Sequence, residues 1–144
     1  RFLLSTSTNC VVPEIQFIQG SVKLKSFYQN GNPSAVMQFV DGVLHGDYAL
    51  YHPNGKTWTT QTYNYDNAEG VKTEYFSDGK VKATYTYKHD NLHGPYKQYN
   101  DKGVLIEEGN DYNDELHGEQ RLYDDTGKLR QVRIYYYGLL LDVK

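Results

Sequence analysis

The sequence predicts an all-β protein, an elongated single-layer antiparallel sheet built from β-hairpin repeats of 24 residues. The main observation is a series of glycines at a fixed step of 24 residues, accompanied by a second series with the same step. These series are Gly31, Gly55, Gly79, Gly103 and Gly127, and Gly46, Gly70, Gly94 and Gly118. A fixed period of this length indicates stacked copies of one supersecondary unit, each of which contacts only its neighbours. Fifteen tyrosines and thirteen glycines among 144 residues agree with a β structure rich in turns.

One copy, from Gly46 to Glu69, explains why each repeat is a hairpin. Asn54-Gly55 lies between two strand-like segments and predicts a tight turn in which both residues take a positive φ. The segment after this turn is rich in threonine and aromatic residues, which favour strands. Asp66-Asn67 then predicts a second turn. Each repeat is therefore predicted to contain two strands and two turns.

Aromatic residues also recur with the period. Four residues before each glycine of the first series stand Phe27, Tyr51, Tyr75, Tyr99 and Tyr123, and eight residues after stand Phe39, Tyr63, Tyr87 and Tyr135. The third full copy carries Asp111 at the second position and Tyr112 one residue later. Because Gly109 comes just before this change, we expect a local β-bulge there.

The strand predicted over residues 80–88 shows how the sheet divides its two faces. Val81, Ala83, Tyr85 and Tyr87 alternate with lysines and threonines. Strict alternation predicts one apolar, aromatic face and one solvated face. Tyrosine suits a shallow core because its ring is buried while its hydroxyl reaches water.

The repeats resemble the MORN repeat, and more closely its bacterial variant form. The resemblance rests on the segments Leu44-His45-Gly46, Leu92-His93-Gly94 and Leu116-His117-Gly118, each followed by a tyrosine and the turn glycine. It covers about residues 22–141 and departs from the pattern at Glu69, at Val104 and in the first copy, which carries Asn32-Pro33. The resemblance implies a hairpin-repeat fold and a role in binding a partner.

Three regions follow from the repeat boundaries: an N-terminal segment or cap (1–21), the repeats (22–141) and an overlapping C-terminal cap or contact segment (135–144). Residues 11–19 are predicted to form an extra strand or a lid. The C-terminal segment contains three consecutive leucines, Leu139, Leu140 and Leu141, in place of a polar terminal copy. Two arrangements would bury these leucines. The segment forms either a lid folded over the aromatic face, which we favour, or a homodimer contact.

Charge restricts the classes of partner. The net charge is −3 and no stripe of lysine or arginine is present, so the sequence argues against a nucleic-acid partner. The same charge predicts weak or absent binding to anionic membranes.

The N-terminal sequence is compatible with two locations, the bacterial cytoplasm and the cell envelope. The single cysteine, Cys10, excludes an intrachain disulfide. Residues before position 11 fit either the remainder of a clipped secretion signal or an ordinary chain end with an inert thiol.

The repeated histidines and aspartates do not predict a cofactor, metal or catalytic site. His93 and His117 are one repeat apart and are expected to lie roughly 10 Å from each other, too far for one zinc ion. The aspartates that recur at one position, Asp66, Asp90 and Asp114, are expected to bond their own turn backbone. We expect no enzymatic activity.

The sequence favours a non-enzymatic protein–protein interaction module. Candidate partner-binding residues are Tyr51, Tyr75, Tyr99 and Tyr123, since tyrosine is common at interfaces; the alternative is that these rings only pack as core. The resemblance further implies an antitoxin or immunity-type protein that sequesters a partner. A cell-envelope or membrane-associated scaffold is the second hypothesis, and an unrecognised enzyme is the third.

Overall fold

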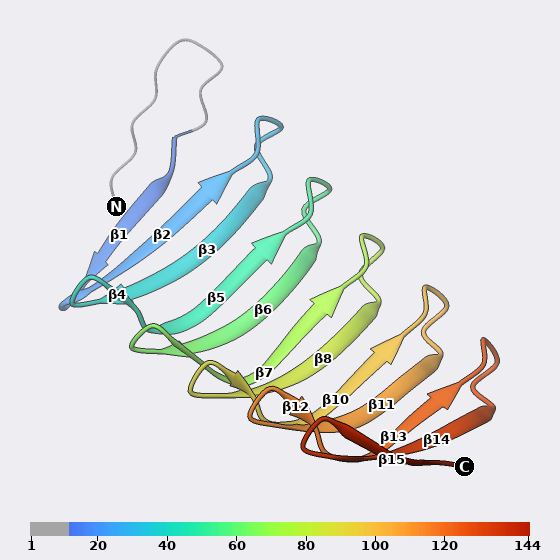
Figure 1. The fold of residues 1–144 in the computed structure, drawn as a ribbon. Coiled ribbons are helices and arrows are strands. Elements are labelled where there is room, and N and C mark those ends of the chain that lie inside the picture. Colours follow the sequence, from blue (N-terminus) through green and yellow to red (C-terminus); the bar gives the residue numbers. More distant parts are fainter. Residues whose placement is uncertain (1–11) are drawn as a thin grey trace.

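The computed structural model describes residues 12–144, which form one open antiparallel sheet of 15 strands and contain no helix. The strands of the hairpins stack side by side from one end of the molecule to the other (Figure 1). The longer strands are β1 (Glu14–Ile18), β2 (Ser21–Phe27), β3 (Pro33–Val40), β5 (Gly46–Tyr51), β6 (Thr57–Asn64), β7 (Asn67–Tyr75), β8 (Val81–Lys88), β10 (Gly94–Tyr99), β11 (Leu105–Tyr112), β13 (Gly118–Tyr123), β14 (Leu129–Tyr136) and β15 (Leu139–Val143). The predicted fold class is confirmed.

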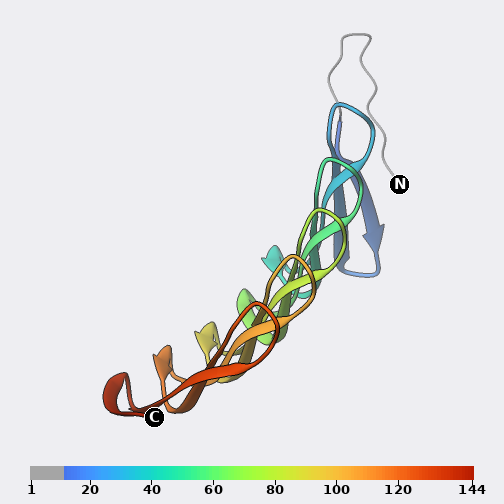
Figure 2. The same ribbon diagram turned by 90° about the vertical axis from the view of Figure 1, so that its right-hand side faces the viewer.

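Three two-residue strands complete the sheet and pair with the ends of longer strands. They are β4 (Val43–Leu44) on β3, β9 (Asn91–Leu92) on β8, and β12 (Glu115–Leu116) on β11. Viewed from the side, the chain around them projects from one surface of the sheet (Figure 2). None of the elements within residues 12–144 is a helix long and apolar enough to cross a membrane.

The hairpins keep the same register from copy to copy. Gly46 lies opposite Tyr63 in the β5–β6 pair, and the equivalent glycines of the next three hairpins lie opposite Tyr87, Asp111 and Tyr135. Asp111 thus occupies the place of the missing tyrosine without any shift in register. The bulge that we expected at Gly109 is therefore wrong.

The bulges lie instead at the other end of each hairpin, next to the glycine turn. There the pairing of each hairpin skips one residue of its second strand. The skipped residues are Ser34, Trp58, Lys82, Ile106 and Arg130, again 24 residues apart. A bulge re-aims its side chain, so these positions can reach over the face of the sheet.

The two turns of each repeat differ from the expected turn chemistry. At the first turn only Gly55 takes a positive φ (88°), while the Asn54 side chain accepts a hydrogen bond from the Lys56 amide at 2.9 Å. The turn with two positive φ values lies at the opposite end, at Tyr65 and Asp66 (44° and 68°). Its equivalents are Asp41-Gly42, His89-Asp90, Asn113-Asp114 and Tyr137-Gly138. This is the pattern of a two-residue primed hairpin turn, in which a non-glycine residue tolerates the left-handed region.

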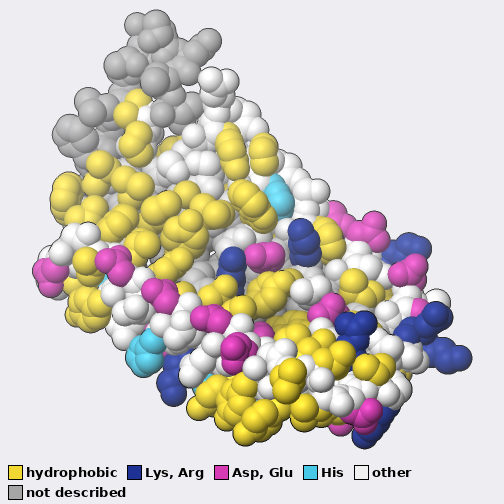
Figure 3. All heavy atoms as spheres, viewed as in Figure 1, with side chains coloured by type: hydrophobic (Ala, Val, Ile, Leu, Met, Phe, Trp, Pro, Cys, Tyr) yellow, Lys and Arg dark blue, Asp and Glu magenta, His cyan; other side chains and the backbone are white. Residues whose placement is uncertain are grey.

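The sheet has an inner face, on the side to which the short strands project, and an outer face. From the N-terminal end, the inner face carries Val22, Leu24, Ala35, Met37, Phe39, Tyr48, Leu50, Thr59, Gln61, Tyr63, Lys72, Glu74, Ala83, Tyr85, Tyr87, Tyr96, Gln98, Glu107, Gly109, Asp111, Gln120, Leu122, Gln131, Arg133 and Tyr135, which pair across the strands. Figure 3, which views this face, shows apolar side chains gathered over the N-terminal strands and more charged groups towards the C-terminal end. The predicted apolar face is thus most apolar over the N-terminal strands, and apolar and charged side chains are mixed towards the C-terminal end.

The core is thin, as expected for a single layer. Within residues 12–144 the buried apolar residues are Ala35, Ala68, Ala83 and Tyr96. Most tyrosines are half-buried, so the repeats are stabilised by many partial burials and by hydrogen bonds between neighbouring copies.

Both ends of the described chain extend the sheet. β1 pairs with β2 and supplies the extra strand expected near residues 11–19. β15 pairs with β14, and Leu139, Leu140 and Leu141 are 63%, 47% and 58% exposed. The lid that we favoured for the C-terminal segment is therefore wrong: the leucines continue the sheet as its last strand, because Tyr137-Gly138 forms an ordinary two-residue turn. Cys10 and the expected secretion signal lie outside the described residues.

Candidate binding surfaces

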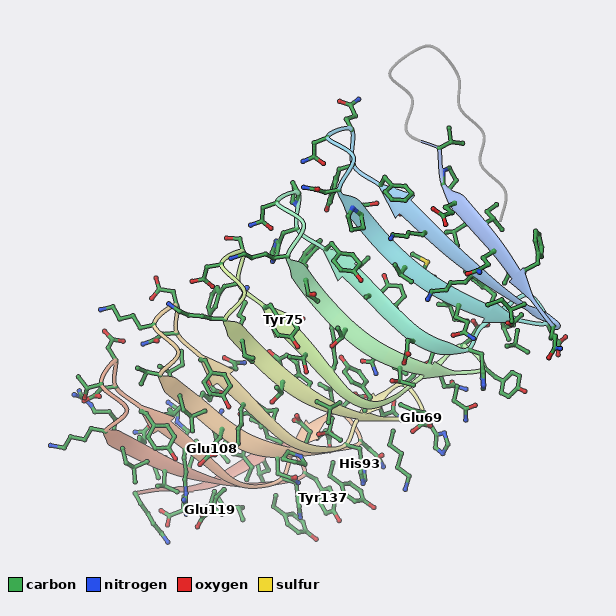
Figure 4. The ribbon with its side chains drawn as sticks, turned by 180° about the vertical axis from the view of Figure 1, so that it is seen from behind. Glu69, Tyr75, His93, Glu108, Glu119 and Tyr137 are labelled. Atoms are coloured by element: carbon green, nitrogen blue, oxygen red, sulfur yellow. The ribbon has the colours of Figure 1, made fainter. Side chains whose placement is uncertain are left out.

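The predicted ladder of Tyr51, Tyr75, Tyr99 and Tyr123 lies on successive hairpins of the outer face. Tyr75 is seen on this face in Figure 4. All four rings are half-buried. The Tyr123 hydroxyl donates a hydrogen bond of 2.7 Å to Glu108, which raises its pKa. The ladder therefore serves the packing of the hairpins, and only part of each ring is open to a partner.

Two of the three repeated histidines, His45 and His117, bond the next turn along the sheet, whereas Nδ1 of His93 is buried without a hydrogen-bond partner. The ring Nδ1 of His45 accepts the Tyr65 amide at 3.2 Å, and His117 accepts the Tyr137 amide at 3.2 Å. Glu69 replaces histidine in the same role, because its carboxylate accepts the His89 amide at 3.0 Å and contacts the His89 ring at 2.7 Å. This departure from the motif thus keeps an acceptor at the same place.

A metal site at these histidines finds no support in the geometry. Residues 12–144 contain no group of three or more histidine, aspartate or glutamate side chains arranged to hold a metal ion. The three repeated histidines instead lie against tyrosine rings, as in the His45–Tyr65 pair with ring centroids 4.4 Å apart. That zinc leaves the stability unchanged stays a prediction.

The repeated aspartates join neighbouring copies, and the expectation that they bond their own turn is wrong. Asp66 accepts the Leu44 amide at 2.8 Å, and its own amide donates to the Leu44 carbonyl at 2.7 Å. Asp90 and Asp114 make the same pair of bonds to Ala68 and Leu92. Each turn is thereby bonded to the equivalent segment of the preceding repeat.

A polar cluster occupies the inner face between β10, β11 and β13. The Tyr96 hydroxyl donates to Glu107 at 2.8 Å, and the Gln120 amide donates to the same carboxylate at 2.9 Å and to Tyr96 at 3.0 Å. Burial raises the pKa of Tyr96, so its hydroxyl remains a donor. The cluster is closed: Tyr96 and Gln120 are 5% and 7% exposed. The Tyr96 hydroxyl and the Gln120 amide nitrogen are therefore bonded within the cluster, whereas the Gln120 side-chain oxygen is buried without a hydrogen-bond partner.

Asp111, next to this cluster, is a carboxylate buried in the sheet, and we expect it to lower the stability of the fold. The side chain is 8% exposed, and burial, with the nearby charge of Asp114, raises its pKa. We expect Asp111→Tyr, which restores the residue found at positions 63, 87 and 135, to raise the free energy of unfolding by about 0.5–2 kcal/mol in urea denaturation.

Asp111→Asn serves as the control for charge. Because the folded pKa is raised, the native state holds the proton more tightly than the unfolded chain. The stability of the unmodified protein therefore falls as the pH rises from about 4, the unfolded value, through the folded pKa. Asp111→Asn is expected to lack this fall. A less stable Asp111→Tyr variant would contradict the prediction.

Three of the exposed aromatic rings gather at the rim near the C-terminal end. Tyr112, Tyr136 and Tyr137 are 41%, 57% and 45% exposed and surround His117, with ring centroids 4.4–6.0 Å apart. Tyr137 and His93 lie at this same rim in Figure 4. We call Tyr112, His117, Tyr136 and Tyr137 the aromatic rim cluster. The sequence predicted a cap or contact segment over residues 135–144, which includes Tyr136 and Tyr137, but it did not indicate Tyr112, which falls outside the recurring tyrosine positions.

A second opening lies on the inner face across β5–β8. It is a groove of about 500 Å³, and its lining is aromatic and polar: Tyr48, Leu50, Trp58, Thr59, Gln61, Tyr63, Ala68, Lys72, Glu74, Lys82, Tyr87 and Asp90. A groove of this size is within the range of small-ligand sites. Sequence reasoning assigned no role to Trp58, whose bulge position could not be recognised from the period.

Comparison with known proteins agrees with the repeat boundaries. The family model of the MORN repeat variant matches residues 44–65, 68–89, 92–114 and 116–136, which together make up more than half of the chain. A search of curated proteins finds no match.

Among solved structures, the chain is similar to the crystal structure of TarM, at 13% identity and a TM-score of 0.42. The match covers 71% of this chain but 19% of TarM, so the chain spans about a fifth of that protein's length. A TM-score this low supports no conclusion about function.

Proposed function

Because the chain belongs to the MORN repeat variant family, as its motifs predicted, we propose that it binds a partner protein through the aromatic rim cluster and the adjoining strand β15. MORN repeats are interaction modules for proteins and membranes, which agrees with a non-enzymatic role. The finer proposal is an antitoxin or immunity-type protein that sequesters its partner.

The observation that carries this proposal is the exposure of a contiguous set of large side chains. Leu139 and Leu141, 63% and 58% exposed, belong to strand β15, which follows Tyr136 and Tyr137 after Gly138. Exposed apolar patches of several large residues mark interaction sites, and tyrosine is favoured at their centres. The tyrosine ladder of the outer face is a secondary candidate surface because its rings are half-buried.

Charge favours a protein partner over a membrane. The chain carries a net charge of −3, and acidic side chains such as Asp114 and Glu115 adjoin the rim. Anionic lipid attracts clusters of lysine and arginine, which this rim lacks within the described residues. The second candidate function, a cell-envelope scaffold, therefore has less support.

The test places a photo-crosslinking amino acid at Tyr136 in the native host, identifies the captured protein and repeats the binding with purified components. We expect the triple variant Tyr112→Ser, Tyr136→Ser, Tyr137→Ser to weaken binding by about a hundredfold, as hot-spot residues do. Tyr65→Ser is the matched control, because Tyr65 occupies the same turn position as Tyr137 but lies outside the cluster.

Equal affinity of the triple variant and the unmodified chain would contradict the assigned surface. Strong sedimentation with anionic vesicles at physiological salt would favour the envelope scaffold instead. Light scattering of the free protein distinguishes a third outcome, in which β15 and the leucines bind a second copy of the chain.

A further inference from the structure

We infer that the inner-face groove across β5–β8 binds a neutral saccharide, a ligand class separate from the protein partner proposed above. The groove combines open aromatic surfaces with buried polar groups that carry no net charge.

The aromatic surfaces come from Trp58, which has no aromatic equivalent in the other repeats, and from three tyrosines at positions where tyrosine recurs. Trp58, the bulge residue of the second hairpin, is 46% exposed and stacked on His52 with centroids 5.6 Å apart. Tyr48, Tyr63 and Tyr87 line the groove from neighbouring strands. The C–H faces of a sugar ring pack against aromatic rings of this kind, and the open indole offers the largest such surface.

The polar groups are held in place before any ligand binds. The Gln61 side chain is 5% exposed, and its amide nitrogen donates to the carbonyls of Thr62 and Glu69 at 3.0 and 3.1 Å. Because both amide hydrogens are engaged, the Gln61 carbonyl oxygen is the group available to accept a ligand hydroxyl. A buried and oriented acceptor at the floor of a groove is typical of a built site.

Lys72 and Glu74 form the second polar element. Their side chains lie on β7, with Nζ and Oε1 3.1 Å apart, and are 30% and 26% exposed. Burial by itself lowers the pKa of Lys72, but the hydrogen bond and charge of Glu74 raise it above the usual value. Lys72 therefore stays charged, and with Glu74 it offers an adjacent donor and acceptor, which match a pair of neighbouring sugar hydroxyls.

The charges of the lining distinguish between ligand classes. Lys72 and Lys82 are balanced by Glu74 and Asp90, so the four ionised groups sum to zero. An anionic ligand such as a phosphate would meet as many carboxylates as ammonium groups. An apolar peptide side chain would remove Gln61, Lys72 and Glu74 from water without supplying hydrogen bonds. A neutral polyhydroxylated ligand brings no charge into the groove and supplies hydrogen bonds to these polar groups.

The test uses Trp58 itself, because it is the one tryptophan of the chain. The full chain is titrated with tetrasaccharides of β-1,4-glucose, α-1,4-glucose, β-1,4-mannose and β-1,4-N-acetylglucosamine, up to about 10 mM, so that a site with a Kd of about 1 mM would still approach saturation. Sodium phosphate and a neutral tetrapeptide serve as competing ligand classes. We expect saturable changes in tryptophan emission with at least one tetrasaccharide and none with phosphate or peptide.

Two variants locate the binding in the groove. Glu74→Gln, which breaks the Lys72 pair, is expected to weaken binding by about tenfold, as loss of one charge-assisted bond does. Its matched control is Glu119→Gln, because Glu119 and Arg121 form an equivalent pair two residues apart on the outer face. Trp58→Ser, which introduces the residue of the first copy at Ser34, is expected to abolish binding in calorimetry while circular dichroism confirms the fold.

Several outcomes overturn the inference. They are the absence of any response to the four tetrasaccharides, binding of phosphate or peptide in their place, and sugar binding that Glu74→Gln and Trp58→Ser leave unchanged. None of these outcomes affects the proposed protein interface, which lies at the C-terminal rim and is probed separately.

Discussion

Replacing Gly94 with alanine is expected to lower the free energy of unfolding by about 2–5 kcal/mol. Gly94 has φ +124°, a conformation that costs an L-residue about 1–2 kcal/mol. An added Cβ would also lie 2.9 Å from Cγ2 of Thr86. Thr86 cannot turn away freely, because its hydroxyl donates to the Pro95 carbonyl at 2.8 Å. Overpacking of this kind adds about 1–3 kcal/mol.

Gly118→Ala is the matched control for this prediction. Gly118 occupies the same place in its repeat, with φ +93°, but a Cβ there meets nothing within 4 Å. We expect this variant to lower the free energy of unfolding by only about 1–2 kcal/mol, the cost of the backbone strain. Urea denaturation followed by circular dichroism measures both. Equal losses at Gly94 and Gly118 would show that the contact with Thr86 yields and that only the backbone conformation matters.

The period alone was sufficient to predict the hairpins, their number and their stacking. Gly55 and its equivalents mark the turns because a left-handed residue is needed once per repeat at the same place. The conformation of the opposite turn was not predictable, because Tyr65 and Asp66 are not typical of a turn with two positive φ values. That turn is fixed from outside, by His45 and by the backbone of Leu44.

The contacts between repeats explain the errors about aspartate. A carboxylate at a turn bonds its own backbone in the local interpretation, whereas Asp66 bonds an amide 22 residues earlier. Such a bond depends on the stacking distance of the copies, which no local pattern encodes. The recurrence of aspartate every 24 residues could have indicated this bond only if the stacking of the copies had also been known.

The candidate surfaces show a different limit. Recurring tyrosines such as Tyr51 were predicted to bind a partner, but a residue that recurs in every copy usually maintains the packing between copies. Three of the exposed aromatic residues, Trp58, Tyr112 and Tyr136, depart from the period. A search for aromatic residues that interrupt the pattern would have found them in the sequence.

Gly109 gives the second prediction, because it is the one glycine of the chain without a positive φ. Its role is therefore to leave space. An added Cβ would lie 2.7 Å from Cε1 and 2.9 Å from the hydroxyl oxygen of Tyr96, whose ring covers the glycine. The ring is held by its hydrogen bonds with Glu107 and Gln120. We expect Gly109→Ala to destabilise the protein by about 1–3 kcal/mol, the usual range for overpacking.

A double-mutant cycle with Tyr96→Ala isolates this contact. Once the ring is removed, alanine at position 109 no longer meets Tyr96 and gains the usual advantage of alanine over glycine in a strand, about 0.5–1 kcal/mol. Gly109→Ala should thus change sign, from destabilising in the unmodified protein to stabilising in the Tyr96→Ala background. Urea denaturation of the four proteins measures the coupling energy. If Gly109→Ala costs the same in both backgrounds, the space above Gly109 is not what this position provides, and its glycine is needed for the backbone instead.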